Sequence, residues 1–362
     1  MRVLVVNTGS SSLKLSVLEP GGDLLETATI ERWAGAGDLD PLTDLLERTG
    51  SADAVGHRVV HGGDRYTEAA PVDQGMMDYL DSIAHLAPSH NPRAVAGMRA
   101  VAEILPDVPA VACFDTAFHS KLPRAASTYA LPRAWNEQWG LRRFGFHGLS
   151  HAYAVRRAAQ LAARTGARTV SCHLGAGASL AAVRDGVCVD TTMGFTPLEG
   201  LVMSTRAGSV DPGLLLWLLG HAGVELEELV EALEHRSGLS GLTGTTGDMR
   251  DVLAGVAEES GDCALALDVF IHRLCREIAA MTASLGGLDL LVLTGGIGEH
   301  AWQVRAAVAH RLSYMGTALD DGTNRRTSGD GDISAPGAVV TTVVVSARED
   351  VEIAGQVAAL LT

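Results

Sequence analysis

The sequence predicts an α/β protein built from two similar lobes. Strand and helix signals alternate along the 362 residues, which is the pattern of α/β folds. A strand–turn–strand segment at residues 1–19 is restated around Gly175, so that Gly175 falls on Gly9 at an offset of 175 − 9 = 166 residues. This length is sufficient for two domains with separate cores. We therefore expect two lobes facing each other across a central cleft; chance similarity between glycine-rich turns is the alternative.

The N-terminal segment indicates a hairpin that suits phosphate oxygens. An apolar run at residues 3–6 stops at Asn7, small residues follow at 9–12, and apolar and polar residues then alternate, which is the period of a second strand. Only Lys14 and Lys121 are lysines among the 28 basic residues. The compact ammonium group of a lysine beside a narrow turn is suited to binding a phosphate oxygen. An ordinary surface hairpin with a solvated lysine is the alternative interpretation.

The second copy of this pattern begins with a predicted buried strand at residues 169–174 (TVSCHL), followed by the turn at residues 175–177. The repeat alignment places Val183 on Val17. Apolar periodicity and capping residues predict the remaining elements. These are helices at 91–105, 150–165, 211–220, 225–235 and 262–285, strands at 288–294 and 339–345, and a C-terminal helix from about Asp350.

Two further local predictions concern the second half of the chain. In the helix at 262–285, the predicted apolar side consists of Leu265, Val269, Leu274 and Ile278. The segment 320–336 (DDGTNRRTSGDGDISAP) is rich in turn-forming residues and predicts a surface loop before the final strand.

Composition excludes several classes of function. Hydrophobic residues make up 47% and charged residues 20% of the chain, as in ordinary globular proteins. The net charge of −15 argues against nucleic-acid partners and anionic membrane surfaces. The five cysteines form no CxxC pair and are expected to be buried thiols of a reducing cytosol. No signal peptide or apolar stretch long enough to span a bilayer is found, so we expect a cytoplasmic protein.

Two common nucleotide-binding motifs are missing from the sequence. No GxxxxGK[ST] occurs, so the chain is not a P-loop enzyme. The turn Gly175-Ala176-Gly177 lacks the third glycine of a dinucleotide fingerprint. Any nucleotide must therefore be held in another way.

Three histidine-containing segments combine charged residues with glycine turns. Arg58 lies in GHRVVHGG (56–63), Asp115 in FDTAFH at the end of an apolar run, and His147 in FGFHGLSH before a helix start. An arginine fork binds a carboxylate, and an acid at the carboxyl end of a strand occupies a usual active-site position in α/β sheets. Each segment alone is at least as typical of hydrogen-bonded structural residues. Together they supply the groups that phosphoryl transfer uses.

A set of motifs in this order resembles the acetate kinase family, within the actin/hexokinase/heat-shock-ATPase superfamily. The motifs are NTGSSSLK (7–14), GHRVVHGGD (56–64), LAPSHNP (86–92), FDTAFH (114–119), YALP (129–132), FGFHGLSH (144–151), HLGAGAS (173–179), MGFTPLEGLVMSTRAG (193–208), GDMRDV (247–252) and TGGIGE (294–299). The resemblance implies a duplicated ribonuclease-H-like (actin-like ATPase) fold with lobes at 1–114 plus 350–362 and at 115–349. It also implies a homodimer that uses ATP and Mg²⁺ to phosphorylate a short-chain carboxylate, acetate or propionate, to an acyl phosphate.

The resemblance assigns roles residue by residue. The implied catalytic residues are Asp115, His147, Arg206 and Arg58, which also binds the substrate carboxylate. The implied wall of the acyl pocket is Val60, Ser89, Phe146 and Pro197. The implied nucleotide contacts are Ser10, Ser12, Lys14, His173, Leu174, Gly175, Ala176, Gly177, Asp248, Met249, Arg250, Gly296, Ile297, Gly298, Glu299 and His300. The implied magnesium-linked residues are Asn7 and Glu349, with Asp350 as the adjacent alternative.

Two residues depart from the family pattern. Ala176 stands where the family usually carries Asn, which implies a missing polar contact to phosphate. Ser89 stands where acetate kinases usually carry Leu, which implies a wider or more polar acyl pocket. A kinase for another short acid such as butyrate, and a non-catalytic or weakly active ATP-binding regulatory protein, are therefore the alternative functions.

Overall fold

The computed structural model describes residues 1–9, 12–31, 33 and 39–362 and divides into two compact units. The first unit comprises residues 1–120, 146–153 and 348–362, and the second comprises residues 121–145 and 154–347. The lobes expected from the sequence differ from this division at residues 115–120, 146–153 and 348–349. The backbone explains part of this difference, because Asp115 N–H bonds to the Val59 carbonyl and Gly148 N–H to the Asp115 carbonyl, which ties both segments to the first sheet.

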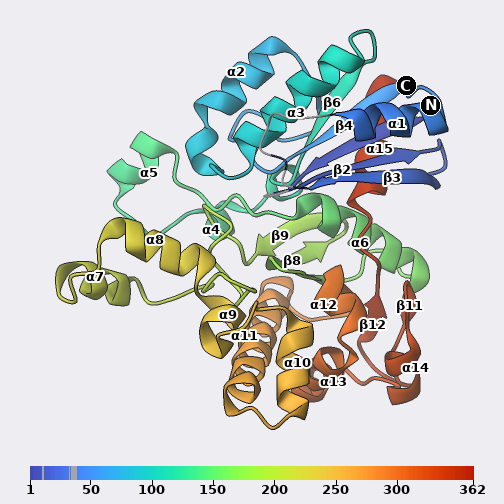
Figure 1. The fold of residues 1–362 in the computed structure, drawn as a ribbon. Coiled ribbons are helices and arrows are strands. Elements are labelled where there is room, and N and C mark those ends of the chain that lie inside the picture. The colour runs from blue at the N-terminus through green and yellow to red at the C-terminus, as the bar shows by residue number, and fades with distance from the viewer. Residues whose placement is uncertain (10–11, 32, 34–38) are drawn as a thin grey trace. The chain divides into compact units, whose positions relative to one another are not determined.

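The first unit is a six-stranded mixed sheet in the order β3-β2-β1-β4-β6-β5, with helices on both faces (Figure 1). Strands β1 and β2 form an antiparallel hairpin, and β1, β4 and β6 are parallel. The elements are β1 Val3–Thr8, β2 Ser12–Leu18, β3 Leu24–Glu31, α1 Asp40–Thr49, β4 Ala54–Val59, β5 Ala70–Pro71, α2 Gln74–Ser82, the 3₁₀ turn Ala84–Leu86, α3 Asn91–Ile104, β6 Ala110–Phe114, the 3₁₀ turn Ala117–His119 and α15 Glu349–Leu361.

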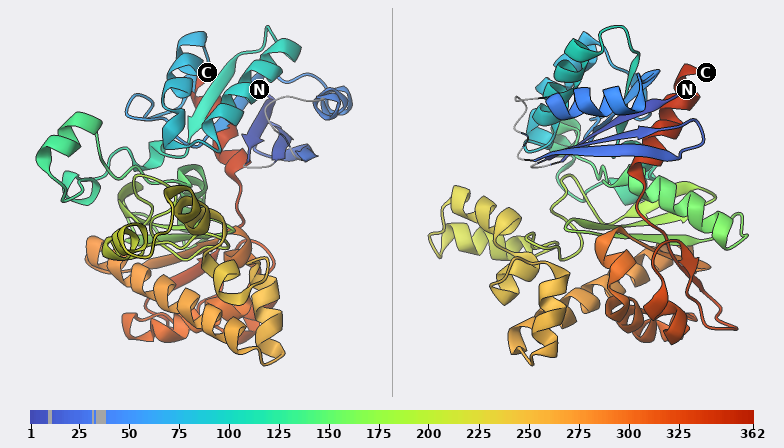
Figure 2. Two further views of the ribbon diagram at one scale, coloured as in Figure 1. Left: turned by 60° about the vertical axis from the view of Figure 1, so that its left-hand side comes forward. Right: turned by 45° about the vertical axis from the view of Figure 1, so that its right-hand side comes forward.

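The alternation of side chains along β1 separates the two cores of this unit. Leu4 and Val6 belong to a cluster with residues of β2, α1 and α3. Val3 and Val5 belong to another cluster with Ile353 of α15. Successive strand residues point to opposite faces, so the two faces of this apolar strand are buried in two separate clusters. Helix α15 comes from the far end of the chain and packs on β1 and β4, so both termini lie in this unit (Figure 2).

The second unit repeats this plan with a sheet in the order β11-β12-β10-β7-β8-β9. The long helix α11 packs on β7, β8 and β9. The elements are α4 Arg124–Ser127, α5 Arg133–Trp139, β7 Thr169–Leu174, β8 Ala178–Arg184, β9 Val187–Thr191, α7 Pro212–Gly220, α8 Leu226–His235, α9 Gly238–Thr243, α10 Met249–Ala257, α11 Gly261–Leu285, β10 Leu290–Thr294, α12 Gly295–His300, α13 Trp302–Arg311, the 3₁₀ turn Ser313–Met315, α14 Asp321–Arg326, β11 Gly331–Asp332 and β12 Thr341–Val344. Helix α6, Gly148–Leu161, begins in the first unit and ends in the second.

The two sheets are copies of one topology. When the second sheet is read from β9, its order β9-β8-β7-β10-β12-β11 corresponds strand by strand to β3-β2-β1-β4-β6-β5 of the first sheet. The third strand of each sheet also carries one extra residue at a matching place, Leu25 of β3 opposite Val17 and Leu18 in the first copy and Val189 of β9 opposite Ala182 and Val183 in the second. A β-bulge retained at matching positions is a specific feature of a fold, so the predicted duplication is confirmed.

The register corrects one detail of the repeat. Val17 pairs with Leu4, and the residue equivalent to Leu4, Val170, pairs with Ala182. The counterpart of Val17 is therefore Ala182, and the predicted alignment of Val183 on Val17 is wrong by one residue. The cause is a second turn one residue shorter than the first, because Thr8 pairs with Leu13 whereas Leu174 pairs with Ala178.

Three other local predictions are corrected. Leu265 is 57% exposed, because the buried stripe of α11 runs through Ala266, Phe270, Leu274 and Ile278 instead. The segment 320–336 is not only a loop, since it contains α14 and β11. Helix α6 begins at Gly148, two residues before the start predicted for the helix at 150–165. No helix among the described residues combines the length and apolar character needed to cross a membrane.

We predict that Ile353→Ala weakens the first unit by about 2–5 kcal/mol, because Ile353 is fully buried between α15 and the sheet. Gly56 of β4 lies so close that a Cβ there would come within 2.5 Å of Ile353, so the helix fits the sheet closely. Urea denaturation measures the loss. Leu361→Ala, at an exposed residue of the same helix, serves as the control and is expected to lie within 0.5 kcal/mol of the wild type.

Candidate active site

The first unit gathers four predicted site residues at the carboxyl ends of its parallel strands. Arg58 of β4 donates to Asp115 through Nη2 (2.7 Å) and Nε (3.2 Å). Its Nη1 donates to Asn7 Oδ1 (3.1 Å) and lies 3.3 Å from Glu349 Oε2. Asn7 Nδ2 in turn donates to Glu349 Oε2 (3.1 Å). The strand order β1-β4-β6 and the start of α15 bring these residues together, although Asn7 and Glu349 lie 342 positions apart in the chain.

Charge and burial make this group net anionic. The side chains of Arg58 and Asp115 are 15% and 1% exposed, and Glu349 is 15% exposed. Burial raises the pKa of Asp115, and the Arg58 charge opposes that rise. For Arg58, burial acts to lower the pKa, but the charges of Asp115 and Glu349 outweigh it and raise the pKa above its usual value. Two carboxylates face one permanent cation, which favours an additional cation.

The donor set fits a magnesium ion. Asp115 Oδ1 is buried and has no hydrogen-bond partner among the described residues. Mg²⁺ prefers oxygen ligands and is usually held by one or two carboxylates together with waters and substrate phosphates. Within the described part of the chain, no cluster of three or more His, Cys, Asp or Glu residues forms a metal cage. The arrangement around Asp115, Glu349 and Asn7 therefore suits a magnesium ion that arrives with phosphate.

Three histidines of the first unit are buried and uncharged. Burial lowers the pKa of His57, His61 and His119 to about 4, so these imidazoles are neutral at pH 7. His119 Nε2 lies 3.0 Å from the Phe146 carbonyl oxygen, and the His61 ring contacts the Phe146 ring edge-on. These contacts hold the segment that carries Phe146 and the predicted catalytic residue after it.

His147 occupies an unusual backbone position. Its φ is +56°, a left-handed conformation that residues with a side chain rarely adopt. The next residue, Gly148, lies so close to Asp115 that a Cβ would come within 2.0 Å of the Asp115 carbonyl oxygen. A left-handed backbone at a residue with a side chain is found mainly at functional sites. The close approach of Gly148 to Asp115 places His147 in the same unit as Arg58 and Asp115.

The predicted phosphate hairpin is described in part. The register pairs Asn7 directly with Lys14, so both side chains leave the same face of the sheet. The turn is closed by a 2.8 Å bond from Gly9 N–H to the Ser12 carbonyl. The predicted contact Ser10 lies outside the described residues.

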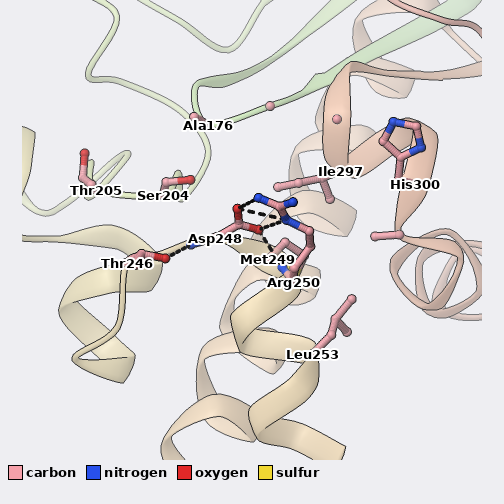
Figure 3. A pocket seen from close by; sticks show the side chains of 13 residues that line it. Ala176, Ser204, Thr205, Thr246, Asp248, Met249, Arg250, Leu253, Ile297 and His300 are labelled. Carbon is pink, nitrogen blue, oxygen red and sulfur yellow. Dashed lines mark hydrogen bonds and ion pairs between the residues drawn. The ribbon is translucent and has the colours of Figure 1, made fainter. Parts of the chain in front are cut away.

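The second unit contains a cavity of about 580 Å³ (Figure 3). It lies among the turn after β7, the start of α10 and helix α12, with Asp248 capping α10 through a bond from Arg250 N–H (2.8 Å). The Arg250 guanidinium returns to the Asp248 carboxylate at 2.5 Å, which lowers the pKa of that acid. The lining residues are Gly175, Ala176, Ser204, Thr205, Thr246, Asp248, Met249, Arg250, Leu253, Gly296, Ile297, His300 and Ala301.

This cavity brings together eight of the predicted nucleotide residues, namely Gly175, Ala176, Asp248, Met249, Arg250, Gly296, Ile297 and His300. The other predicted contacts of this unit do not line it. Leu174 is fully buried, and Gly298 and Glu299 bond to other parts of the unit. His173 pairs with Ser179 of β8, and the Gly177 carbonyl closes the turn by accepting from Gly175 N–H. The sequence reasoning missed Ser204, Thr205, Thr246, Leu253 and Ala301. Ser204 and Thr205 lie within the quoted motif MSTRAG, and Thr246 directly precedes GDMR, so adjacency was the available signal.

The remaining predicted residues divide between the units. Val60 and Phe146 are buried and Ser89 is exposed in the first unit, whereas half-buried Pro197 belongs to the second. Arg206 also belongs to the second unit, where burial lowers its pKa and the charge of Glu234 partly opposes that effect. The roles of these residues stay predictions.

The duplicated sheets and their hairpins define the class of the protein, an α/β fold of the actin-like ATPase type. Comparison then narrows the class: residues 36–355 match the model of the Acetokinase family, and the chain belongs to this family. An acetate kinase of Nostoc punctiforme (strain ATCC 29133 / PCC 73102) is 45% identical over 314 residues, covering 86% of this chain and 77% of the relative.

Solved structures agree with this assignment. The crystal structure of Porphyromonas gingivalis acetate kinase is 32% identical and matches the whole of both chains with a TM-score of 0.93. A propionate kinase from Francisella tularensis subsp. tularensis SCHU S4 is 31% identical and covers 99% of each chain with a TM-score of 0.91. The predicted family and fold class are confirmed.

We predict that Asp115→Asn lowers kcat by at least roughly 100-fold, because it removes one negative charge from the Arg58 group and the unpartnered oxygen beside it. Formation of hydroxamate from the acyl phosphate measures the rate. Asp81→Asn, at an exposed acid paired with Arg99, is the matched control and should retain wild-type turnover. Full activity of the Asp115 variant would show that this carboxylate has no part in the reaction.

We also predict that Ala176→Asn lowers the KM for ATP by about 2- to 10-fold, the effect of one added hydrogen bond. Ala176 is exposed at the cavity wall, so the larger side chain has room. Steady-state kinetics at saturating carboxylate measure the change. Ala125→Asn, at an exposed position of α4, is the control. An unchanged or raised KM would contradict a phosphate or nucleotide contact at this position.

Proposed function

We propose that the protein transfers the γ-phosphoryl group of ATP to a short-chain carboxylate, acetate or propionate, and that the reaction is reversible. The observation that carries this proposal is the group of Arg58, Asp115, Glu349 and Asn7 in a chain of the acetokinase family. This group combines a cation for an incoming carboxylate with an anionic edge for a divalent ion. The membership of the family supports the same class of reaction.

The chemistry needs little acid or base catalysis. A carboxylate is already ionised at pH 7, so no strong base must activate it. The barrier comes mainly from the repulsion between two anions, which positioned cations reduce. We assign Arg58 to the substrate carboxylate, and His147 and Arg206 to the phosphoryl group during transfer. Asp115 orients Arg58 through its two hydrogen bonds.

Magnesium would be held by Asp115 and Glu349 with Asn7, and when bound it neutralises phosphate charge. The protein's own contribution is to keep Arg58 fixed between the two acids, so that the guanidinium needs little reorganisation when substrate arrives. An arginine on a transferring phosphoryl group contributes roughly 10³–10⁵ in rate in related reactions.

The cavity of the second unit suits the nucleoside part of ATP. Met249, Leu253 and Ile297 offer apolar surface for a base, and Ser204, Thr205 and Thr246 offer hydroxyl groups (Figure 3). A mostly apolar pocket with a few placed polar groups is typical of ligand sites. Lys14 and Ser12, beside the turn of the first hairpin, are assigned to phosphate oxygens.

We further propose a cytoplasmic homodimer. Helix α7 is apolar in sequence, yet Leu214, Leu216 and Trp217 are 45%, 71% and 52% exposed. Exposed apolar faces of this kind are covered in protein–protein contacts. A non-catalytic ATP-binding role is not favoured, because the chain retains Arg58 and Asp115 in bonded geometry.

The substrate test uses acetate, propionate and butyrate in the hydroxamate assay. Ser89 is exposed in the turn before α3, and its small polar side chain is expected to widen the acyl pocket. We predict that kcat/KM for propionate is within about 3-fold of that for acetate. We further predict that Ser89→Leu raises the ratio of kcat/KM for acetate to kcat/KM for propionate by roughly 3- to 10-fold, which is the usual effect of one to two methylenes in a pocket. Ser82→Leu, at an exposed residue of α2, is the control. A sharp acetate optimum in the wild type would contradict the widened pocket, and no acyl phosphate from any acid would overturn the function.

A further inference from the structure

Arg93 of helix α3 carries a buried donor atom on a charged side chain. Its Nη1 atom is buried, and no described residue accepts a hydrogen bond from it. Within the described part of the chain, Arg93 also forms no ion pair. By contrast, Arg99 on the same helix pairs with Asp81 at 2.8 Å on the surface. A buried donor of a charged group without an acceptor is rare in folded proteins and requires an explanation.

The position of Arg93 in the fold places it at the active edge of the first sheet. It lies in the first turn of α3, which packs against β1 and β4. At the start of this helix, Asn91 exchanges two hydrogen bonds with the backbone of His61, which directly follows the predicted acyl-pocket residue Val60. The N-terminal end of α3 therefore lies at the carboxyl ends of the parallel strands, beside the predicted substrate site.

The helical period shows which strand Arg93 faces. Gly97, one turn later on the same side, lies against Thr8, where a Cβ would come within 3.4 Å of the Thr8 hydroxyl. Val101 follows on this side and packs with Leu4 and Val6 of β1. Arg93 thus lies about 6 Å beyond Thr8 along the helix axis, and helical side chains lean further in that direction. Arg93 therefore lies toward the carboxyl end of β1, where Gly9 follows Thr8.

The negative charge at the carboxyl edge of the first sheet favours a second cationic side chain there. The charge of Arg58 is already met by Asp115 and Glu349, so that group is net negative. A phosphoryl group brought to the same edge carries further negative charge. The Arg93 guanidinium, whose Nη1 has no acceptor among the described residues and which lies toward the Gly9 end of β1, meets this charge without giving up a bond from that atom.

We propose that Arg93 binds the phosphoryl group that is transferred, as the γ-phosphate of ATP in one direction and as the acyl phosphate in the other. The proposal rests on the proposed function and adds a specific residue to it. Arg93 contacts phosphate oxygens and not the acyl chain, so its loss affects phosphate-bearing substrates selectively.

The test compares Arg93→Gln and Arg93→Lys with Arg99→Gln as the matched control, in both directions of the reaction. For Arg93→Gln we expect the KM for acetyl phosphate and the inhibition constant of inorganic phosphate to rise roughly 10- to 100-fold. The KM for ATP is expected to rise less, since the cavity of the second unit also binds the nucleotide, and the KM for acetate should stay within 3-fold. Arg93→Lys should recover part of the loss, and Arg99→Gln should behave as the wild type.

Three results would overturn the assignment. Phosphate constants that are equal in Arg93→Gln and Arg99→Gln would show that Arg93 does not touch phosphate. A selective rise in the KM for acetate would place it on the carboxylate instead. An equal loss for all substrates with a lowered Tm and no recovery by lysine would show a structural role. If the wild type forms no acyl phosphate, the proposed function fails, and calorimetric binding of inorganic phosphate to wild type and Arg93→Gln still decides the role of Arg93.

Discussion

A buried guanidinium at the carboxyl edge of the first sheet is the constraint on which the rest of the first unit depends. Removing a charge from water is expensive unless bonded partners replace the water. Arg58 obtains those partners from three places: Asn7 at the end of β1, Asp115 after β6 and Glu349 at the start of α15. The C-terminal helix must therefore return to the N-terminal sheet, where its apolar face also completes the core around Val3 and Val5. Site and fold are joined through this one residue.

Duplication supplied two similar scaffolds that now carry different chemistry. Both sheets keep the bulge between their second and third strands, but the hairpin turns have diverged. The first turn is longer and is followed by Lys14 opposite Asn7. The second is a short glycine turn without a lysine, and its Gly175 and Ala176 form part of a cavity wall. A charged edge suits phosphate and carboxylate, whereas a largely uncharged cavity suits the nucleoside.

Much of this arrangement could be predicted because the signals were local or repeated. The buried strand at 169–174 and the long helix at 262–285 follow from periodicity, and both are confirmed. Leu265 was misplaced because apolar residues occur on several sides of α11, so periodicity alone does not select the buried stripe, whereas packing against β8 does. The shift from Val183 to Ala182 depends on the length of a turn, which the composition of Gly175-Ala176-Gly177 does not fix.

The site was predictable only where chemistry needs charged or glycine-rich motifs. Arg58 and Asp115 lie in such motifs, whereas Glu349 was implied only by the family resemblance, and the structure brings these three together. Ser204, Thr205 and Thr246 line the cavity with ordinary hydroxyl groups that occur throughout the chain, so nothing in their identity marked them. Arg93 was not predicted as a site residue for a related reason. An arginine in the first turn of a helix is normally solvated, and only the packing of α3 shows that Nη1 of Arg93 is buried.

Two unmet groups of opposite charge in one unit point to a single kind of ligand. Asp115 Oδ1 is a buried acceptor and Arg93 Nη1 a buried donor, and neither has a hydrogen-bond partner among the described residues. A lone carboxylate would satisfy only the arginine, and a lone metal ion only the acid. A phosphate that carries a divalent cation satisfies both, since its oxygens accept from a guanidinium while the cation binds a carboxylate. The polarity of these two atoms therefore favours a magnesium–phosphate complex over either component alone as the ligand of this edge.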